Sequence, residues 1–138
     1  MGQVKLLIAD DQVENLQLLV DIFSQEGYEI IAARNGQEAL DMARKELPDL
    51  ILLDINMPTL NGYEVCETLQ GSDETEDIAI IFLSAQDSSV DESHGLRLGA
   101  VDFISKPFVI EIVKQRVKMH MELKQLKQKL AECQKKLG

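Results

Sequence analysis

The sequence is poor in cysteine and contains no long apolar run. Its 138 residues include only two cysteines, Cys66 and Cys133, which lie far apart and lack the spacing of a metal site. We therefore expect two reduced thiols rather than a disulfide or a zinc site. No apolar stretch is long enough to span a bilayer, and the N-terminus lacks the charged and apolar regions of a signal peptide. These absences predict a cytoplasmic protein without a membrane segment.

Positive charge is also scarce. Lys and Arg number 14 against 24 Asp and Glu, which gives a formal net charge of -10 at pH 7. Such a charge repels the phosphates of nucleic acid, so we expect no direct nucleic-acid binding. The chain has neither internal repeats nor low-complexity segments. With 45% hydrophobic and 28% charged residues, it fits one compact domain that buries a core.

Five apolar runs of strand length alternate with segments of helical periodicity. The predicted strands are residues 4–9, 29–33, 50–54, 78–83 and 101–104. The predicted helices are residues 13–26, 35–46, 62–70 and 88–98, followed by a long last helix from about residue 108. Gly27 and Gly99 are expected to end helices, and Asn35 with Glu38 to begin one. This alternation predicts an α/β fold with a doubly wound parallel sheet, because right-handed crossovers place helices on both faces.

Polar side chains follow four of these strands. They are Asp10 and Asp11 after the first strand, Asp54 at the end of the third, Ser84 after the fourth and Lys106 after the fifth. In a parallel sheet wrapped by helices, ligands bind outside the carboxyl ends of the strands. We therefore expect these side chains to meet in one crevice. Three carboxylates, a hydroxyl and an ammonium group suit a divalent cation together with a phosphoryl group.

Asp54 is the candidate nucleophile of this crevice. A carboxylate can attack phosphorus and form an acyl phosphate, as aspartyl-phosphate enzymes show. Asp10 and Asp11 would crowd negative charge beside Asp54 unless a cation intervenes. Mg2+ is the expected cation, because it prefers hard oxygen ligands and bridges carboxylates to phosphate oxygens. The main-chain oxygen of Asn56 could supply a further ligand.

Lys106 and Ser84 complete the predicted site. The ammonium group of Lys106 can neutralise phosphoryl charge, and the hydroxyl of Ser84 can donate a hydrogen bond to a phosphoryl oxygen. Taken singly, each polar residue has an ordinary explanation. Asp10, Asp11 and Ser84 could cap helices, and Lys106 could be solvated surface. Their joint occurrence at four strand ends favours the functional interpretation.

Five short stretches carry a family resemblance. They are Leu7-Ile8-Ala9-Asp10-Asp11, Leu52-Leu53-Asp54-Ile55-Asn56-Met57-Pro58, Asn61-Gly62-Tyr63-Glu64, Leu83-Ser84-Ala85 and Phe103-Ile104-Ser105-Lys106-Pro107-Phe108. Through them, residues 4 to about 118 resemble the receiver domain of bacterial two-component response regulators. The resemblance implies the flavodoxin-like strand order 2-1-3-4-5. It also implies phosphoryl transfer, with Mg2+, from a histidine kinase or a histidine phosphotransfer protein.

The resemblance implies a role for each matching position. Asp54 would be the phosphoacceptor and Lys106 the phosphate-binding lysine. Pro107 would follow a cis peptide bond, which costs little before proline. The Mg2+ ligands would be Asp10, Asp11, Asp54 and the main-chain oxygen of Asn56, and the switch pair would be Ser84 and Phe103.

The switch positions depart from the commonest family pattern. Ser84 stands in place of threonine, Phe103 lacks a tyrosine hydroxyl, and Gln86 occupies a position that tunes dephosphorylation. Phosphorylation adds about -1.5 to -2 charge at neutral pH. When Ser84 moves toward the phosphoryl oxygens, Phe103 can turn inward, and the surface formed by residues 88–98, the fifth strand and the last helix changes shape. Phe103 could instead be an ordinary core aromatic residue.

Apolar residues of the last helix follow the spacing of a coiled coil. With Leu123 at heptad position a, Glu122 falls at g and Lys127 at the following e, which favours a parallel homodimer. We therefore divide the chain into a receiver over residues 1–118 and a helical extension over 119–138. The alternative is a single helix that frays after about Leu126. The predicted seam consists of Met119, Leu123, Leu126, Leu130, Cys133 and Leu137.

Other interpretations stay open at this level. The chain could be a phosphohydrolase that works through Asp54, although the second carboxylate needed as a general acid is absent. It could also be a dimerising scaffold that ignores phosphorylation. His94 and His120 lack any metal-binding or phosphodonor pattern and are expected on the surface. The chain ends in mid-heptad without an output domain, so a stand-alone receiver and the front of a longer protein both fit.

Overall fold

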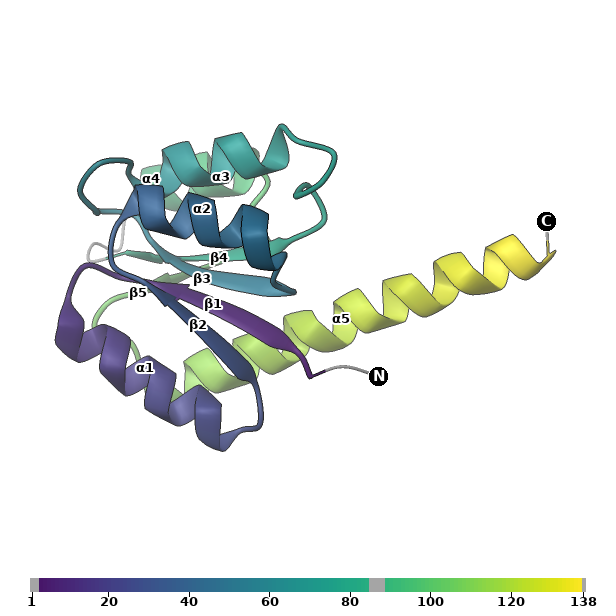
Figure 1. The fold of residues 1–138 in the computed structure, drawn as a ribbon, viewed down its shortest axis with the longest axis horizontal. Helices are drawn as coiled ribbons and strands as arrows, with labels where there is room; N and C mark the ends of the chain where they lie inside the picture. Colours follow the sequence, from purple (N-terminus) through teal and green to yellow (C-terminus); the bar gives the residue numbers. More distant parts are fainter. Residues whose placement is uncertain (1–2, 85–88, 138) are drawn as a thin grey trace.

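The computed structural model describes residues 3–84 and 89–137. Five strands form one sheet in the order β2-β1-β3-β4-β5, and every neighbouring pair is parallel. This confirms the doubly wound order 2-1-3-4-5, and Figure 1 shows helices on both faces of the sheet. The strands are β1 (Lys5–Ala9), β2 (Glu29–Ala33), β3 (Leu50–Asp54), β4 (Ala79–Ser84) and β5 (Asp102–Ser105).

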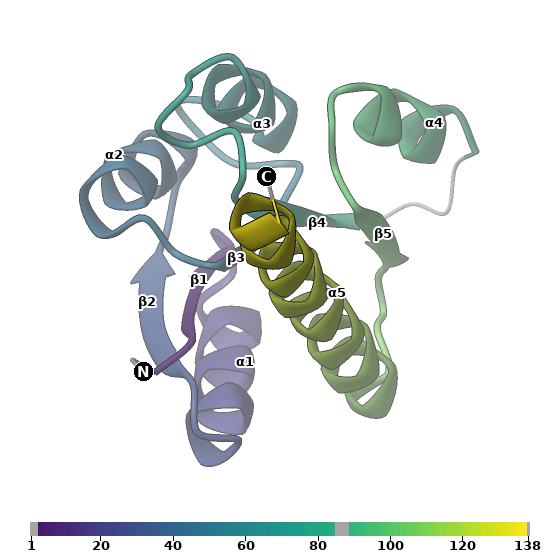
Figure 2. The same ribbon diagram turned by 90° about the vertical axis from the view of Figure 1, so that its right-hand side faces the viewer.

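Helices divide between the two faces of the sheet. One face carries α1 (Val13–Gln25) and α5 (Ile110–Leu137), and the other carries α2 (Gly36–Glu46), α3 (Gly62–Gln70) and α4 (Ser89–Arg97), as Figures 1 and 2 show. Successive strand residues point to opposite faces. In β3, Leu50 and Leu52 therefore join the core under α1 and α5, while Ile51 and Leu53 join the core under α2 and α3. Burial on both faces explains the uninterrupted apolar run of this strand.

Capping side chains begin two of the helices. Asn35 accepts a hydrogen bond from the backbone N–H of Glu38, as predicted. Asn61 and Glu64 form a reciprocal capping box at α3, which the sequence analysis did not recognise. At α1 the N-cap is Gln12, without a side-chain cap, so the alternative that Asp10 or Asp11 caps this helix is wrong.

Some boundaries differ from the predicted ones by one or two residues. β4 and β5 begin and end one residue later, because their ladder continues until Ser84 pairs with Ser105. α5 begins at Ile110, since the first N–H groups of the helix bond to the carbonyl of Val109. The Lys106-Pro107 peptide bond is cis, as expected. Gln86 lies outside the described residues.

α5 is longer than the body of the domain. Its 28 residues correspond to about 42 Å at 1.5 Å per residue. The helix starts near the carboxyl edge of the sheet and runs past the opposite edge (Figure 1). Met121 is still buried in the core, whereas residues 125–135 are all exposed. Among the described residues, no helix is long and apolar enough to cross a membrane.

Candidate functional site

Three carboxylates meet at the carboxyl edge of the sheet. Asp54 is the last residue of β3, and Asp10 and Asp11 directly follow β1. One oxygen from each residue lies within 4.8 Å of the others. Asp10 is fully buried and Asp54 is 3% exposed, whereas Asp11 faces solvent. Because β1 and β3 are neighbours, the backbone holds the two buried carboxylates together, and Asp11 leaves the cluster open on one side.

Lys106 lies inside this carboxylate cluster. Its Nζ is 3.0 Å from Oδ2 of Asp10 and 3.5 Å from Oδ1 of Asp54, and its side chain is largely buried. The backbone N–H of Lys106 donates to the carbonyl of Ser84, the last residue of β4. Ser84 itself is buried. The ends of β1 and β3 and the residue after β5 thus bring the three carboxylates and the ammonium group together, and Ser84 ends the neighbouring strand β4.

The electrostatics of the cluster centre on Asp54. Burial raises the pKa of Asp54 to about 6; the nearby Lys106 opposes this rise, and the negative charges of Asp10 and Asp11 add to it. The single ammonium group therefore does not offset the burial of Asp54 and the negative charges of its two neighbours. Additional positive charge placed among these oxygens would favour the ionised form of Asp54.

An open hollow of about 680 Å³ lies directly outside the cluster. Asn56 borders it, and the loop that begins at Asn56 folds back so that the backbone N–H of Gly62 donates to the carbonyl of Ile55. A Cβ at Gly62 would lie 2.5 Å from the carbonyl oxygen of Asp54, so a larger residue would displace the end of β3 that carries Asp54. Polar and apolar side chains both line the hollow. They are those of Asp11, Gln12, Asn15, Leu18, Asp54, Asn56, Lys106, Pro107, Phe108 and Ile110.

Phe103 lies away from the hollow, in the core on the α3 and α4 side. It is 9% exposed and pairs with Phe82 of the neighbouring strand. The ring of Tyr63 meets Phe82 edge-on at 5.4 Å and His94 at 4.6 Å. The ring contacts therefore run from Phe82 of β4 through Tyr63 of α3 to His94 of α4, which is exposed as expected.

The surface position expected for His120 is wrong. Its side chain is only 11% exposed, and its Nε2 lies 2.9 Å from Oδ2 of Asp102. Arg116, one helical turn earlier, donates to both carboxylate oxygens of Asp102 at 2.7 and 2.8 Å. The spacing of Arg116 and His120 by four residues places both on one side of α5. That spacing was the available signal in the sequence, but it does not identify Asp102 as the shared partner.

The carboxylate cluster fits a small divalent cation. Each aspartate offers a hard oxygen ligand within reach of the other two. Exposed Asp11 and Asn56 border the hollow, so water can complete the coordination. Mg2+ is commonly held in this way, by one or two carboxylates and several waters. The residues present are therefore compatible with Mg2+.

The raised pKa of Asp54 leads to a stability prediction. The folded protein binds a proton at Asp54 more tightly than the unfolded chain does, so stability should fall as pH rises from about 4 through about 6. Asp54→Asn removes this penalty. Allowing for partial solvent screening, we expect the variant to stabilise the metal-free protein by about 1–2 kcal/mol at pH 7 and by far less at pH 4.

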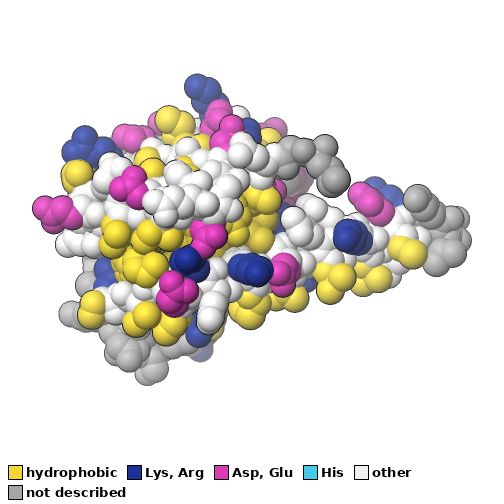
Figure 3. All heavy atoms as spheres, turned by 90° about the horizontal axis from the view of Figure 1, so that it is seen from below, with side chains coloured by type: hydrophobic (Ala, Val, Ile, Leu, Met, Phe, Trp, Pro, Cys, Tyr) yellow, Lys and Arg dark blue, Asp and Glu magenta, His cyan; other side chains and the backbone are white. Residues whose placement is uncertain are grey.

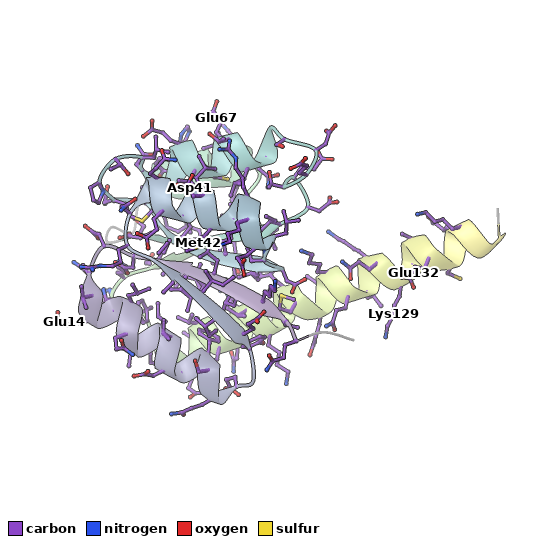
Figure 4. The ribbon with its side chains drawn as sticks, in the orientation of Figure 1. Glu14, Asp41, Met42, Glu67, Lys129 and Glu132 are labelled. Carbon is purple, nitrogen blue, oxygen red and sulfur yellow. The ribbon has the colours of Figure 1, made fainter. Side chains whose placement is uncertain are left out.

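Urea unfolding at both pH values measures this difference. The matched control is Asp41→Asn, at an exposed position on α2 (Figure 4), which should leave the pH dependence as it is in the wild type. An Asp54→Asn variant that is no more stable than the wild type at pH 7 would contradict the assigned electrostatics.

A parallel sheet with carboxylates and a lysine at its carboxyl edge defines an α/β module suited to a cation and a phosphoryl group. The sequence matches the model of the response regulator receiver domain over residues 6–118. The chain therefore belongs to the response regulator receiver family, whose members act in two-component phosphorelay signalling.

Curated relatives agree with this family. The chain is 39% identical over 127 residues to a Vibrio cholerae protein named "Probable cyclic di-GMP phosphodiesterase", covering 92% of this chain and 29% of the relative. It is 41% identical over 114 residues to the alkaline phosphatase synthesis transcriptional regulatory protein PhoP of Bacillus subtilis, covering 83% of this chain and 47% of PhoP. The chain thus spans less than half the length of these curated relatives.

A solved structure shares the fold. Chemotaxis protein CheY4 of Vibrio cholerae superposes with a TM-score of 0.80 at 28% identity, covering 86% of this chain and 98% of CheY4. The part left uncovered is small, and the receiver fold accounts for most of the chain.

Proposed function

We propose that this chain receives a phosphoryl group on Asp54, with Mg2+, from a histidine kinase or a histidine phosphotransfer protein. The observation that carries the proposal is the cluster of Asp10, Asp11 and Asp54 around Lys106 at the carboxyl edge of the sheet. Membership of the receiver family also supports the proposal, because proteins of this family take their phosphoryl group from a phosphodonor partner. The predicted cytoplasmic location, without direct nucleic-acid binding, belongs to the same proposal.

Each site residue has a distinct task in this reaction. A carboxylate oxygen of Asp54 forms a bond to phosphorus, while the bond from phosphorus to the donor nitrogen breaks and the electron pair stays on the donor imidazole. Asp10, Asp11 and the main-chain oxygen of Asn56 hold the cation beside Asp54. Bound Mg2+ supplies charge neutralisation between the carboxylates and the phosphoryl group.

Lys106 and Ser84 act on the product of the transfer. The ammonium group of Lys106 already lies 3.5 Å from Asp54, so it can pair with a phosphoryl oxygen attached there. The hydroxyl of Ser84, at the end of the next strand, donates to a second phosphoryl oxygen. The ring of Phe103 already lies in the core. We propose that drawing the Ser84 hydroxyl toward the phosphoryl group lets this ring repack, which changes the surface formed by α4, β5 and α5.

The rim of the hollow suits a partner with an apolar face. Leu18, Phe108 and Ile110 line it beside the acceptor, and Leu18 is 45% exposed. A donor that places its phosphohistidine over Asp54 would cover these side chains and exclude water from the transfer. We further propose that the receiver forms a homodimer through α5 and so controls a partner or an attached output.

The role of Asp11 in this proposal can be tested by metal titration. Asp11→Ala removes one oxygen ligand but leaves Asp54 and Lys106 in place, so we expect Mg2+ affinity to fall by about tenfold or more. Phosphorylation by acetyl phosphate should then need correspondingly more Mg2+ to reach the wild-type extent. Isothermal titration with Mg2+ and intact-mass analysis provide the two readings. Unchanged affinity in Asp11→Ala would remove this residue from the cation site.

A further inference from the structure

The phosphorylation site and the free part of α5 lie at opposite ends of the molecule. The carboxylate cluster is at the carboxyl edge of the sheet, while the exposed stretch of α5 leaves from the amino edge (Figure 1). Any effect of the site on this stretch must therefore pass along the receiver body. β5 and the buried half of α5 connect the two ends, because β5 runs from the amino edge to Lys106 and α5 returns beside it.

Asp102 is the polar contact between these two elements. It is the first residue of β5, and its carboxylate accepts from Nη1 of Arg116 at 2.7 Å and lies 2.9 Å from Nε2 of His120. The backbone N–H of Phe103 donates to Oδ1 of the same carboxylate at 2.8 Å. One carboxylate thus binds both the backbone of the proposed switch aromatic residue and two side chains of the long helix.

This contact is held firmly on both sides. The side chain of Asp102 is 15% exposed and that of His120 is 11% exposed. Burial pushes the pKa of Asp102 upward, but the hydrogen bonds from Arg116, His120 and Phe103 outweigh it and leave the pKa below its usual value. The carboxylate is therefore ionised at neutral pH, and both of its oxygens accept from the single Nη1 of Arg116, at 2.7 and 2.8 Å, in a charge-assisted contact.

The two faces of β5 pack into different cores of the domain. Phe103 joins the core under α3 and α4, whereas the next residue, Ile104, packs with Val113, Val117 and Met121 of α5. Because the amide of Phe103 is tied to Asp102, a backbone shift that turns Phe103 also moves the carboxylate that anchors α5. A movement of Phe103 can therefore reach α5 through the backbone of β5 and the side chain of Asp102, without passing from one core to the other.

Arg116 connects Asp102 to the predicted seam as well. It lies seven residues before Leu123 and so occupies the preceding heptad position a. While Asp102 neutralises it, the guanidinium group is directed to β5; once released, it would place an unpaired charge at the start of the seam. Two such charges would face each other in a parallel dimer and repel.

From these contacts we propose that Asp102 is a positioning residue that couples Phe103 to the direction of α5 and to the charge at the start of its seam. This rests on the proposed phosphorylation of Asp54. Lys124, whose Nζ donates to the carbonyl of Asp49 at 2.7 Å, marks the last fixed point of the helix. The exposed residues that follow then move as a lever.

The lever can be measured within one protomer. Spin labels at the native Cys133 and at Asp41→Cys on α2 (Figure 4) report the distance between the tip of α5 and the receiver body. Cys66 stays unlabelled because it is buried and burial raises the pKa of its thiol to about 11. Residues 124 to 133, which follow the last fixed point of the helix, span about 14 Å, so a tilt of about 10° moves the tip by about 2 Å. Dilution with unlabelled protein removes distances between protomers.

We expect phosphorylation to shift this distance in the wild-type background and to shift it by less than half as much in Asp102→Asn. Arg116→Gln removes the same contact from the helix side and should give the same loss. The matched control Glu111→Gln changes an exposed carboxylate of α5 that does not contact Asp102 and should respond as the wild type does.

Intact mass, read in parallel, separates the possible failures. If no variant gains a phosphoryl group, the proposed function itself is wrong. If all variants are phosphorylated and Asp102→Asn and Arg116→Gln shift as fully as Glu111→Gln, the coupling role of Asp102 is overturned. A phosphorylated wild type whose distance does not change overturns it too.

Discussion

Asp54→Asn is expected to gain no phosphoryl group under conditions in which the wild type gains one. Asparagine keeps the shape of the side chain, but its amide oxygen is neutral and cannot replace the carboxylate as a nucleophile toward phosphorus. The other two carboxylates are poorly placed to compensate, because Asp10 is fully buried against Lys106 and Asp11 points toward solvent. We therefore expect loss of the reaction rather than a partial decrease.

Intact-mass spectrometry after incubation with Mg2+ and acetyl phosphate measures this result. Asp41→Asn, on the exposed side of α2, makes the same chemical change away from the site and should be phosphorylated as the wild type is. The adduct should be lost in mild base, as expected of an acyl phosphate. Equal phosphoryl gain in Asp54→Asn would place the acceptor elsewhere and remove the basis of the proposed function.

The second large effect concerns the oligomeric state. Leu126 and Leu130 are 64% and 61% exposed in the single chain, and Figure 3 shows apolar side chains in a row along the projecting helix. Burying each leucine would contribute roughly 1.5–3 kcal/mol. The labelled Lys129 and Glu132 extend from the same stretch, clear of the receiver body (Figure 4). We expect a parallel dimer of the wild type, and a monomer when Leu126→Lys and Leu130→Lys are combined.

Sedimentation equilibrium on the full chain tests this expectation. The matched control combines Gln125→Lys and Gln128→Lys, which add the same charge at heptad positions away from the seam and should leave the dimer intact. Cys133 reports the orientation, because in a parallel, in-register pair the two thiols face each other at position d and a mild oxidant should link them. Monomeric wild type at high concentration would contradict the seam and leave the tail as a single extended helix.

The sheet, and the meeting of Asp10, Asp11, Asp54 and Lys106 at one end of it, could be predicted because both depend on local signals. Each polar site residue directly follows or ends an apolar strand, so the parallel order alone brings Asp10, Asp54 and Lys106 to one edge. The helix starting at Asn35 was likewise readable from its cap. These features need no knowledge of how one helix is rotated against the sheet.

The features that were missed depend on such a rotation. Whether His120 faces solvent or Asp102 is decided by the angle at which α5 packs on β5, and the periodicity of α5 allows both. The rotation of α5 also decides where Lys124 points, and its Nζ donates to the carbonyl of Asp49, the residue before β3 at the amino end of the sheet. The predicted boundary at residue 118 stays a prediction, and apolar spacing does not reveal that Met121, beyond it, is buried in the core.

Chemical trapping of the phosphorylated residue is the most direct test of the central claim. Borohydride reduces an aspartyl phosphate to homoserine, and peptide sequencing by mass spectrometry then locates the reduced residue. After treatment with Mg2+ and acetyl phosphate, homoserine should be found at position 54 and at no other aspartate. Homoserine at position 10 or 11, or none in a protein that has gained a phosphoryl group, would contradict the assignment of Asp54 as the acceptor.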